Sequence, residues 1–274
     1  MPPSRCSEVR DIDAQRFLIP RIERHASLVS TNDEAMRRAR EGHGGGVVWI
    51  VAEEQTGGRG RHGRPWTSPP GNLHTSLLLI NPVPVAQTPE LGFVAGIALA
   101  HALRDTLGGD ARIKIKWPND MLFDGAKISG LMLEGSVLAD GNFAVVIGMG
   151  VNCAHYPASL AYPATSLQEI AGRPVGTAEV LARLVNQMSH WLGLYGSANN
   201  FALIREQWLG MAAGLGAPII VDIGGRKVAG SFTSIDERGR LIVETPDGPS
   251  FIEAGDVFLP GASPAVPSTE NSEL

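Results

Sequence analysis

A seven-residue stretch, GRGRHGR at residues 58–64, alternates glycine with three arginines and one histidine. Glycines let a backbone approach a ligand closely, and arginines donate paired hydrogen bonds to phosphate or carboxylate oxygens. This composition predicts a loop that binds a polyanion such as the phosphate chain of a nucleotide. A solvated surface loop that binds RNA loosely explains the stretch, taken alone, equally well. The pattern is not a Walker A loop, since no Gly-Lys-Ser/Thr closes it, nor a Rossmann fingerprint, since no helix follows.

A second stretch with chemical potential, KWPND at residues 116–120, precedes Lys127. We expect a strand to end at Pro118 and to present Asn119 and Asp120 at its tip, where a nucleotide or a metal-bound phosphate can meet them. A plain Pro-Asn-Asp turn is the alternative. Lys127 begins the next strand, where an outward-pointing lysine is the ordinary outcome, and Glu134 fits a solvent-facing strand residue.

Composition excludes several classes of protein. The chain has 274 residues, of which 23 are basic and 28 acidic, and the net charge of −5 argues against broad nucleic-acid coating. No apolar run is long enough to cross a membrane, and the N-terminus lacks the apolar core of a secretory signal. Two cysteines provide neither a metal-binding spacing nor a disulfide framework. We therefore predict a cytoplasmic protein without a membrane partner.

The elements that must position these residues follow from periodicity and turn signals. Helices are expected at 31–41, 89–107, 177–196 and 199–210, and strands at 47–52, 73–80 and 112–117. Thr31 and Glu34 have the spacing of a capping box, with Thr31 as the N-cap. Residues 123–152 predict two hairpins that turn at Asp124-Gly125 and Asp140-Gly141. Because hairpins join neighbouring strands, the pattern favours an α+β fold, a mixed sheet with helices on one face, over a doubly wound sheet.

The texture of the sequence changes near residue 214. Short alternating strands separated by glycine-containing turns predict a small β-barrel at residues 214–260. Residues 1–213 then form the first domain, with a poorly defined segment at 1–20, and the polar, Pro/Ser-rich residues 261–274 predict a disordered tail.

Six segments together resemble the biotin protein ligases. They are STN (30–32), EQTGGRGRHGRPW (54–66), GNLHTS (71–76), KWPND (116–120), KISGLMLE (127–134) and IGMGVN (147–152). Each is weak alone, but their order and spacing are specific. The resemblance implies a class II synthetase-like biotin/lipoate ligase catalytic domain followed by an SH3-like barrel. It also implies the form without an N-terminal DNA-binding domain, since about 25 residues precede the pattern, too few for a helix-turn-helix reader.

In this family biotin reacts with ATP, accompanied by Mg²⁺, to give biotinyl-5′-AMP and pyrophosphate, and biotin then passes to one lysine of a biotin carboxyl carrier domain. The resemblance implies catalytic roles for Lys127, Arg61 and Arg59, because joining two anions needs fixed positive charge. The loop would order over the intermediate and exclude water, and without ligand we expect it to be mobile.

The binding residues implied by the resemblance fall into two sets. The biotin set is Ser30, Thr31, Asn32, Gln55, Gly58, Arg59, Trp66, Lys127, Gly130, Gly148 and Gly150. The nucleotide set is Arg59, Arg61, His62, Gly63, Arg64, Trp66, Asn119, Asp120, Lys127 and Asn152. In this picture Trp66 walls the ligand, the three strand glycines pack against it, and no chemistry is assigned to the His62 side chain. The adenine-stacking aromatic is Tyr156, Tyr162 or neither, and the metal ligands remain unassigned.

The partners implied are biotin, ATP and the carrier domain of a biotin-dependent carboxylase, with no nucleic acid; a monomer and a homodimer both fit. Three other functions were weighed: a lipoate ligase or octanoyltransferase, a nucleic-acid-binding module, and an inactive homologue. The two charged motifs favour the biotin branch over the lipoyl branch. The acidic balance argues against the nucleic-acid module, and the joint presence of Arg59, Arg61, Asn119, Asp120 and Lys127 argues against an inactive homologue.

Overall fold

The computed structural model describes residues 20–42, 46–158, 160, 162–197 and 200–259. The tail expected at 261–274, and all but the last residue of the N-terminal segment expected at 1–20, lie outside the described residues. No helix in the described ranges is long and apolar enough to cross a membrane.

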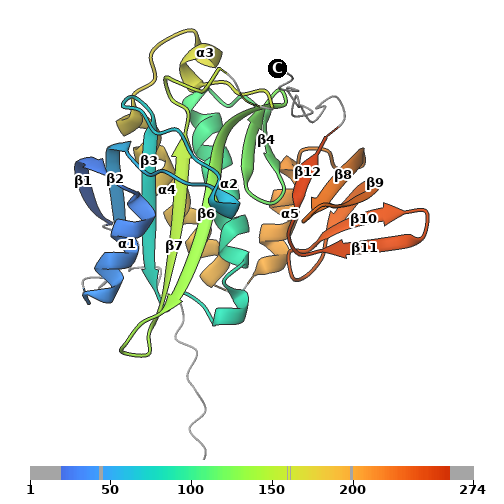
Figure 1. Ribbon diagram of the computed structural model, residues 1–274, viewed down its shortest axis with the longest axis horizontal. Helices are drawn as coiled ribbons and strands as arrows, with labels where there is room; N and C mark the ends of the chain where they lie inside the picture. Colours follow the sequence, from blue (N-terminus) through green and yellow to red (C-terminus); the bar gives the residue numbers. More distant parts are fainter. Residues whose placement is uncertain (1–19, 43–45, 159, 161, 198–199, 260–274) are drawn as a thin grey trace, which may run out of the picture.

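A seven-stranded sheet forms the centre of the first unit, in the order β1-β2-β3-β7-β6-β5-β4 (Figure 1). The bounds are β1 Arg21–Leu28, β2 Val48–Gln55, β3 Leu73–Ile80, β4 Ile113–Lys116, β5 Asp120–Phe123, β6 Ala126–Val137 and β7 Phe143–Val151. Only β1 and β2 pair in parallel, and every other neighbouring pair in this sheet is antiparallel. The mixed sheet and both hairpins are therefore as predicted, whereas β1 was not predicted.

Helices cover both faces of this sheet. The bounds are α1 Thr31–Arg40, α2 Glu90–Thr106, α3 Leu167–Ala171, α4 Thr177–Gly196 and α5 Phe201–Met211. The large apolar core lies under α2, α4 and α5, while Ala35 and Ala39 of α1 pack in a separate cluster with Val48, Ile50 and Leu78. Residues alternate along a strand, so these two clusters lie on opposite faces. Helices on one face therefore describes α2, α4 and α5, and α1 is the exception (Figure 1).

The start of α1 also differs from the expectation. Ser30, not Thr31, is the N-cap, and its hydroxyl accepts a hydrogen bond from the Asp33 backbone N–H at 3.4 Å. Thr31 is the first helical residue, so its side chain is free to serve a different contact.

A second sheet of five antiparallel strands follows α5, in the order β11-β10-β9-β8-β12. The bounds are β8 Pro218–Ile223, β9 Arg226–Ile235, β10 Leu241–Thr245, β11 Gly248–Ile252 and β12 Asp256–Phe258. We call this unit the C-terminal barrel. Phe232 of β9 stacks edge-on against Trp208, which in turn meets Phe93 of α2, so a continuous apolar core joins the barrel to the first unit.

Candidate active site

The floor of the site is one row of residues across the large sheet. Strand register places Asp120, Gly130, Gly150 and His74 side by side on β5, β6, β7 and β3. Directly paired residues point to the same face, and this face carries the N-terminus of α1. Gly130 and Gly150 carry no side chains, so other groups can approach the strand backbone closely at this strip of the floor, which we call the trough.

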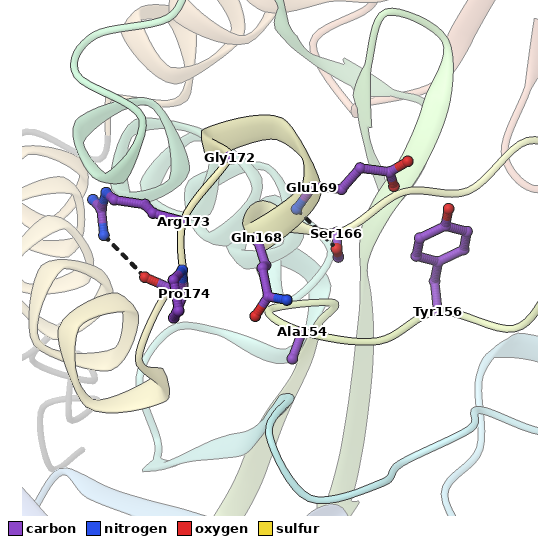
Figure 2. A pocket seen from close by; sticks show the side chains of 8 residues that line it. All are labelled: Ala154, Tyr156, Ser166, Gln168, Glu169, Gly172, Arg173 and Pro174. Carbon is purple, nitrogen blue, oxygen red and sulfur yellow. Dashed lines mark hydrogen bonds between the residues drawn. The ribbon is translucent and has the colours of Figure 1, made fainter.

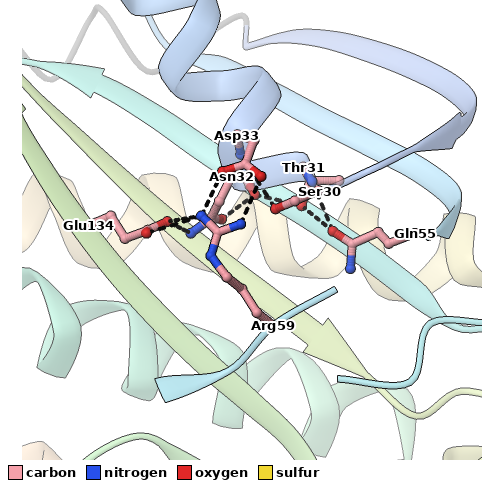
Figure 3. A network of polar contacts seen from close by, with 8 residues as sticks. Ser30, Thr31, Asn32, Asp33, Gln55, Arg59 and Glu134 are labelled. Carbon is pink, nitrogen blue, oxygen red and sulfur yellow. Dashed lines mark hydrogen bonds and ion pairs between the residues drawn. The ribbon is translucent and has the colours of Figure 1, made fainter. Parts of the chain in front are cut away.

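A hydrogen-bonded polar cluster closes one end of this trough (Figure 3). The Thr31 backbone N–H and hydroxyl both donate to Gln55 Oε1, at 2.8 and 3.1 Å, and Gln55 Nε2 donates to Ser68 Oγ at 2.9 Å. Ser30, at the head of α1, is buried beside them. The structure thus brings together the predicted Ser30, Thr31 and Gln55, which can pair with a polar ligand end.

Asn32 lies over Gly148 and forms hydrogen bonds with Ser76 and Glu134. Ser76 Oγ lies 2.6 Å from Asn32 Oδ1, and Asn32 Nδ2 donates to Glu134 Oε2 at 2.6 Å. A methyl group at Gly148 would lie 2.2 Å from Asn32 Oδ1. Gly148 therefore makes room for Asn32, and its predicted approach to biotin stays a prediction.

Trp66 covers the other glycine. A methyl group at Gly150 would lie 2.5 Å from Trp66 Nε1, so the indole rests directly on the strand backbone. Within the part of the chain that the structure describes, this buried Nε1–H has no hydrogen-bond partner. Gly130, in contrast, has no atom closer than 3.5 Å to the same position, and Lys127 and Asp120 border that space. The trough therefore has an aromatic wall over Gly150 and an open end beside a lysine.

Lys127 lies close to both Trp66 and Asp120. Its Nζ pairs with Asp120 Oδ1 at 2.7 Å and lies 5.5 Å from the Trp66 ring and 5.4 Å from the Tyr162 ring. Ammonium groups within about 6 Å of an aromatic face are attracted to it. Tyr162 is thus the one of the two candidate aromatics that the structure places against Lys127.

Asn152 supports the same lysine from below. It is buried and donates to the Thr165 carbonyl at 3.1 Å, while the Thr165 backbone N–H donates to the Lys127 carbonyl at 3.0 Å. Asn152, expected to contact the nucleotide or to organise the residues around it, thus holds Thr165 beside Lys127, and its contact with a nucleotide stays a prediction.

The arginine-glycine loop, residues 58–64, bends back on itself above the trough. Gly60 N–H donates to Arg64 O at 2.7 Å, Trp66 N–H donates to Gly58 O at 2.9 Å, and a methyl at Gly58 would lie 2.6 Å from Trp66 O. His62 and Gly63 at its tip have φ of 56° and 70°, the left-handed region that favours glycine, and both are exposed. Arg59, Arg61 and Arg64 all form hydrogen bonds with residues outside the loop, whereas His62 is exposed at its tip.

Each arginine of this loop has a different partner. Arg59 forms a bidentate pair with Asp33 at 2.8 and 2.6 Å and reaches Glu134 at 3.2 Å (Figure 3). The Asp33 hydrogen bonds raise the pKa of Arg59 above its ordinary value. Glu134, expected to face solvent, is in fact a partner of both Asn32 and Arg59.

Arg61 is half-buried, and its hydrogen bonds to other described residues are long. Its nearest acceptors are Asn119 Oδ1 and the Gly255 carbonyl, both at 3.3 Å, and Asp256 Oδ1 lies 4.0 Å away. Burial lowers the pKa of this guanidinium, although it remains a cation at neutral pH. Arg64, more exposed, forms a direct ion pair with Asp256 Oδ2.

Two residues of the site were missed from the sequence. Ser76 lies under Thr31 and Asn32, and His74 occupies the floor row beside Gly150. His74 is 1% exposed, its Nε2 lies 3.2 Å from Pro69 O, its Nδ1 has no hydrogen-bond partner among the described residues, and burial lowers its pKa. Both stand in the quoted GNLHTS segment, where alternation along the strand places them on one face.

An open pocket of about 390 Å³ is lined in part by Tyr156, one of the two candidate adenine-stacking aromatics (Figure 2). Its lining residues are Ala154, Tyr156, Ser166, Gln168, Glu169, Gly172, Arg173 and Pro174. A hydrogen bond to Glu169 raises the pKa of Tyr156. Tyr156 thus faces this pocket rather than Lys127.

No group of three or more His, Cys, Asp or Glu able to hold a metal ion occurs in the described part of the chain. Mg²⁺ that accompanies a nucleotide commonly uses one or two carboxylates plus phosphate oxygens and water. Asp120, with the amide oxygen of Asn119 beside it, fits that donor set.

Comparison with known proteins adds to this geometry. The model of the biotin/lipoate A/B protein ligase family matches residues 26–152, and that of the biotin protein ligase C-terminal domain matches residues 214–259. The chain is 41% identical over 240 residues to a biotin–[acetyl-CoA-carboxylase] ligase of Paracoccus denitrificans, covering 85% of this chain and 98% of that protein.

The chain belongs to the biotin protein ligase family. It is also 28% identical over 239 residues to the biotin–[acetyl-CoA-carboxylase] ligase of Mycobacterium tuberculosis, covering 85% and 86% of the two chains. The structure resembles that of the Aquifex aeolicus biotin protein ligase in complex with biotin and ATP, with a TM-score of 0.71 and 28% identity over 87% of this chain and 98% of that one. The predicted fold, a mixed sheet with helices and an SH3-like C-terminal unit, is confirmed.

Proposed function

We propose that this family member is an ATP-dependent biotin–protein ligase whose site is the trough over Gly130 and Gly150. The observation that carries the proposal is the order of chemistry along it. A polar cluster of Thr31 and Gln55 closes one end, an indole covers the middle, and Lys127 marks the other end. Biotin has this order too: a ureido ring, an apolar body and a carboxylate.

The first half-reaction needs positive charge where two anions meet. A biotin carboxylate oxygen forms a bond to the α-phosphorus of ATP, the bond from that phosphorus to the β-bridging oxygen breaks, and pyrophosphate leaves. Lys127, held by Asp120 at 2.7 Å, is placed to stabilise charge on the oxygens involved. Arg61, whose contacts are all 3.3 Å or longer, has donors available for phosphate. Mg²⁺ bound near Asp120 would neutralise further phosphate charge.

The second half-reaction transfers the acyl group. The ε-amine of a carrier-domain lysine forms a bond to the carboxyl carbon of the adenylate, the bond from that carbon to the phosphate oxygen breaks, AMP leaves, and the amine loses a proton. Trp66 and the loop over the trough exclude water, which would otherwise hydrolyse the adenylate. The acceptor we propose is the biotin carboxyl carrier domain of acetyl-CoA carboxylase, named in the description of the Paracoccus denitrificans relative.

Mass spectrometry tests the proposal directly. Purified protein is incubated with ATP and Mg²⁺ and either biotin or lipoate, and bound species are measured. A bound species at the mass of biotinyl-5′-AMP, formed only with biotin, is the expected result. Lipoyl adenylate would move the chain to the lipoyl branch, and no adenylate from either acid in folded protein would contradict an adenylating function. A cytoplasmic location, the absence of a nucleic-acid partner and the choice between monomer and homodimer stay predictions.

A further inference from the structure

The arginine-glycine loop is attached to the C-terminal barrel at the start of β12. Arg64 donates to Asp256 Oδ2, and both terminal nitrogens of Arg61 lie 3.3 Å from the Gly255 carbonyl oxygen. These contacts join residues about 190 positions apart in the chain, so nothing local in the sequence produces them.

The barrel is held in place without this contact. Phe232 packs against Trp208 with ring centroids 6.5 Å apart, Trp208 packs against Phe93 at 5.4 Å, and Trp117 Nε1 donates to the Gly239 carbonyl at 3.3 Å. These side chains are buried, and a buried aromatic cluster contributes far more than a surface ion pair. Because the barrel keeps its position through this core, Asp256 is held by the barrel, and its ion pair with Arg64 restrains the loop.

The loop needs such a restraint. Glycine lies at positions 58, 60 and 63, and ordering glycine has a high entropic cost. Arg64 lies close enough to Arg61 that its positive charge lowers the pKa of Arg61. Burial alone would raise the pKa of Asp256. The hydrogen bond from Arg64 and the charges of Arg64 and Arg61 together outweigh burial, so the pKa of Asp256 is below its ordinary value. Asp256 is ionised at neutral pH and offsets this repulsion.

The two arginines share Asp256 unequally. Arg64, with 62% of its side chain exposed, makes the direct ion pair. Arg61, with 22% exposed, lies 4.0 Å from the same carboxylate and otherwise has only the two acceptors at 3.3 Å. A guanidinium has five N–H donors, and weak contacts leave it free to bind a stronger anion.

We propose that the Arg64–Asp256 ion pair is a clasp that fixes the arginine-glycine loop on the C-terminal barrel and leaves Arg61 available for nucleotide phosphate. Asp256 is then a positioning residue for ATP, and Arg64 acts through it instead of binding the nucleotide directly as the sequence predicted. The inference rests on the proposed function, which supplies the nucleotide.

Charge reversal tests the clasp. The variants are Asp256→Arg, Arg64→Asp and the double variant, with Asp222→Asn and Asp256→Asn as a matched pair. Asp222 lies opposite Asp256 in the β8–β12 pairing, and its carboxylate accepts from Gly225 N–H at 2.7 Å and, among the described residues, forms no ion pair with the arginines of the loop. We expect Asp256→Asn to raise KM for ATP about five-fold, the size of a good exposed ion pair, and Asp222→Asn to leave it unchanged. Each single reversal should raise KM for ATP at least 10-fold, because like charges then face each other, while KM for biotin moves less than two-fold.

The decisive result is rescue. The double variant should return KM for ATP to within about three-fold of the parent, since it restores one cation and one anion at the same pair of positions. A double variant as impaired as the single reversals would overturn the clasp, and so would an Asp256→Asn variant that binds ATP more tightly, because Asp256 would then compete with phosphate.

Hydrogen exchange supplies a readout that does not depend on activity. Without any substrate, amides of residues 58–66 should exchange faster in Asp256→Asn than in the parent and in Asp222→Asn, with the double reversal near the parent rate. Unchanged exchange in all variants would refute the clasp even in a fully active ligase. Faster exchange in a protein that forms no adenylate would instead support the clasp and contradict the proposed function.

Discussion

Substituting Gly150 by alanine should push Trp66 off the floor of the trough. The added methyl group would lie 2.5 Å from Nε1 and 2.6 Å from Cε2 of the indole, whereas ordinary contacts begin at 3.4 Å. The indole must therefore withdraw by about 0.9 Å, and overpacking of this kind costs about 1–3 kcal/mol. The free energy of unfolding should fall by about that amount, and biotin affinity about 10- to 100-fold as the wall moves.

A double-mutant cycle isolates the cause. Urea unfolding is measured for the parent, Gly150→Ala, Trp66→Ala and the double variant, with biotin affinity from calorimetry on the same samples. The three atoms nearest to the added methyl group all belong to the indole, so truncating Trp66 removes them, and alanine gains about 0.5–1 kcal/mol over glycine in a strand. Gly150→Ala should then be neutral or slightly stabilising in the Trp66→Ala background. Gly130→Ala is the stability control, because its methyl group meets nothing closer than 3.5 Å.

The reasoning fails if Gly150→Ala costs the same free energy with and without Trp66. That result would mean that the strand backbone, and not the indole, resists the methyl group. Equal losses of stability in Gly150→Ala and Gly130→Ala would lead to the same conclusion, since the two glycines face each other across β6 and β7.

Three further predictions test other parts of the structure. Lys127→Met should slow ATP-dependent adenylate formation at least about 100-fold, measured by pyrophosphate release, because fixed charge at the reacting oxygens is lost; urea unfolding should change by less than about 1 kcal/mol, because Lys116 remains 3.6 Å from Asp120. Trp208→Ala should cost about 3–5 kcal/mol of stability in thermal unfolding, and an effect below 1 kcal/mol would show that the barrel does not share the core. Since burial lowers the pKa of His74, its contribution to stability is full above its unfolded pKa near 6.5 and is lost as the pH falls below it. His74→Gln should therefore flatten the decline in urea-unfolding free energy between pH 7 and 5 by up to about 1.4 kcal/mol per pH unit; an unchanged decline would contradict the role of His74.

Local signals in the sequence were sufficient for much of the fold. Alternation and the Asp-Gly turns predicted β5–β7 within a few residues, because a hairpin is specified by its own pattern. The edge strand β1 reads RIERHASL, with charged residues in its first half. It was missed because a strand that pairs on one side and is mostly exposed has no apolar run. The face chosen by α1 could not be predicted either, because a helical period shows that one side is buried but not against which face of the sheet.

At the site, too, the sequence predicted residues in recognisable motifs but not the partners of charged side chains. Residues with a special type at a special spacing, such as Gln55 and Lys127, were found from the sequence. The partners of charged side chains were not: Glu134 binds Arg59 across 75 positions, and Asp256 binds Arg64 across 192. A carboxylate on an exposed strand looks the same in the sequence whether it faces solvent or a cation, so only tertiary structure separates the two cases.

The carboxylates around the site, whether or not they were predicted, each form an ion pair with a cation. Arg59 pairs with Asp33 and Glu134, Lys127 with Asp120, and Arg64 with Asp256. Leaving a partly buried cation unpaired is costly, so these carboxylates balance the positive charge of Arg59, Lys127 and Arg64. Under the proposed function, substrate anions at Arg59 and Lys127 would exchange with carboxylates already present instead of meeting bare charge. Affinity then depends on the difference between two ion pairs, which favours the multiply charged triphosphate over a single carboxylate. Arg61 differs from these three cations, because its acceptors among the described residues all lie at 3.3 Å or more, so phosphate binding there replaces the weakest contacts.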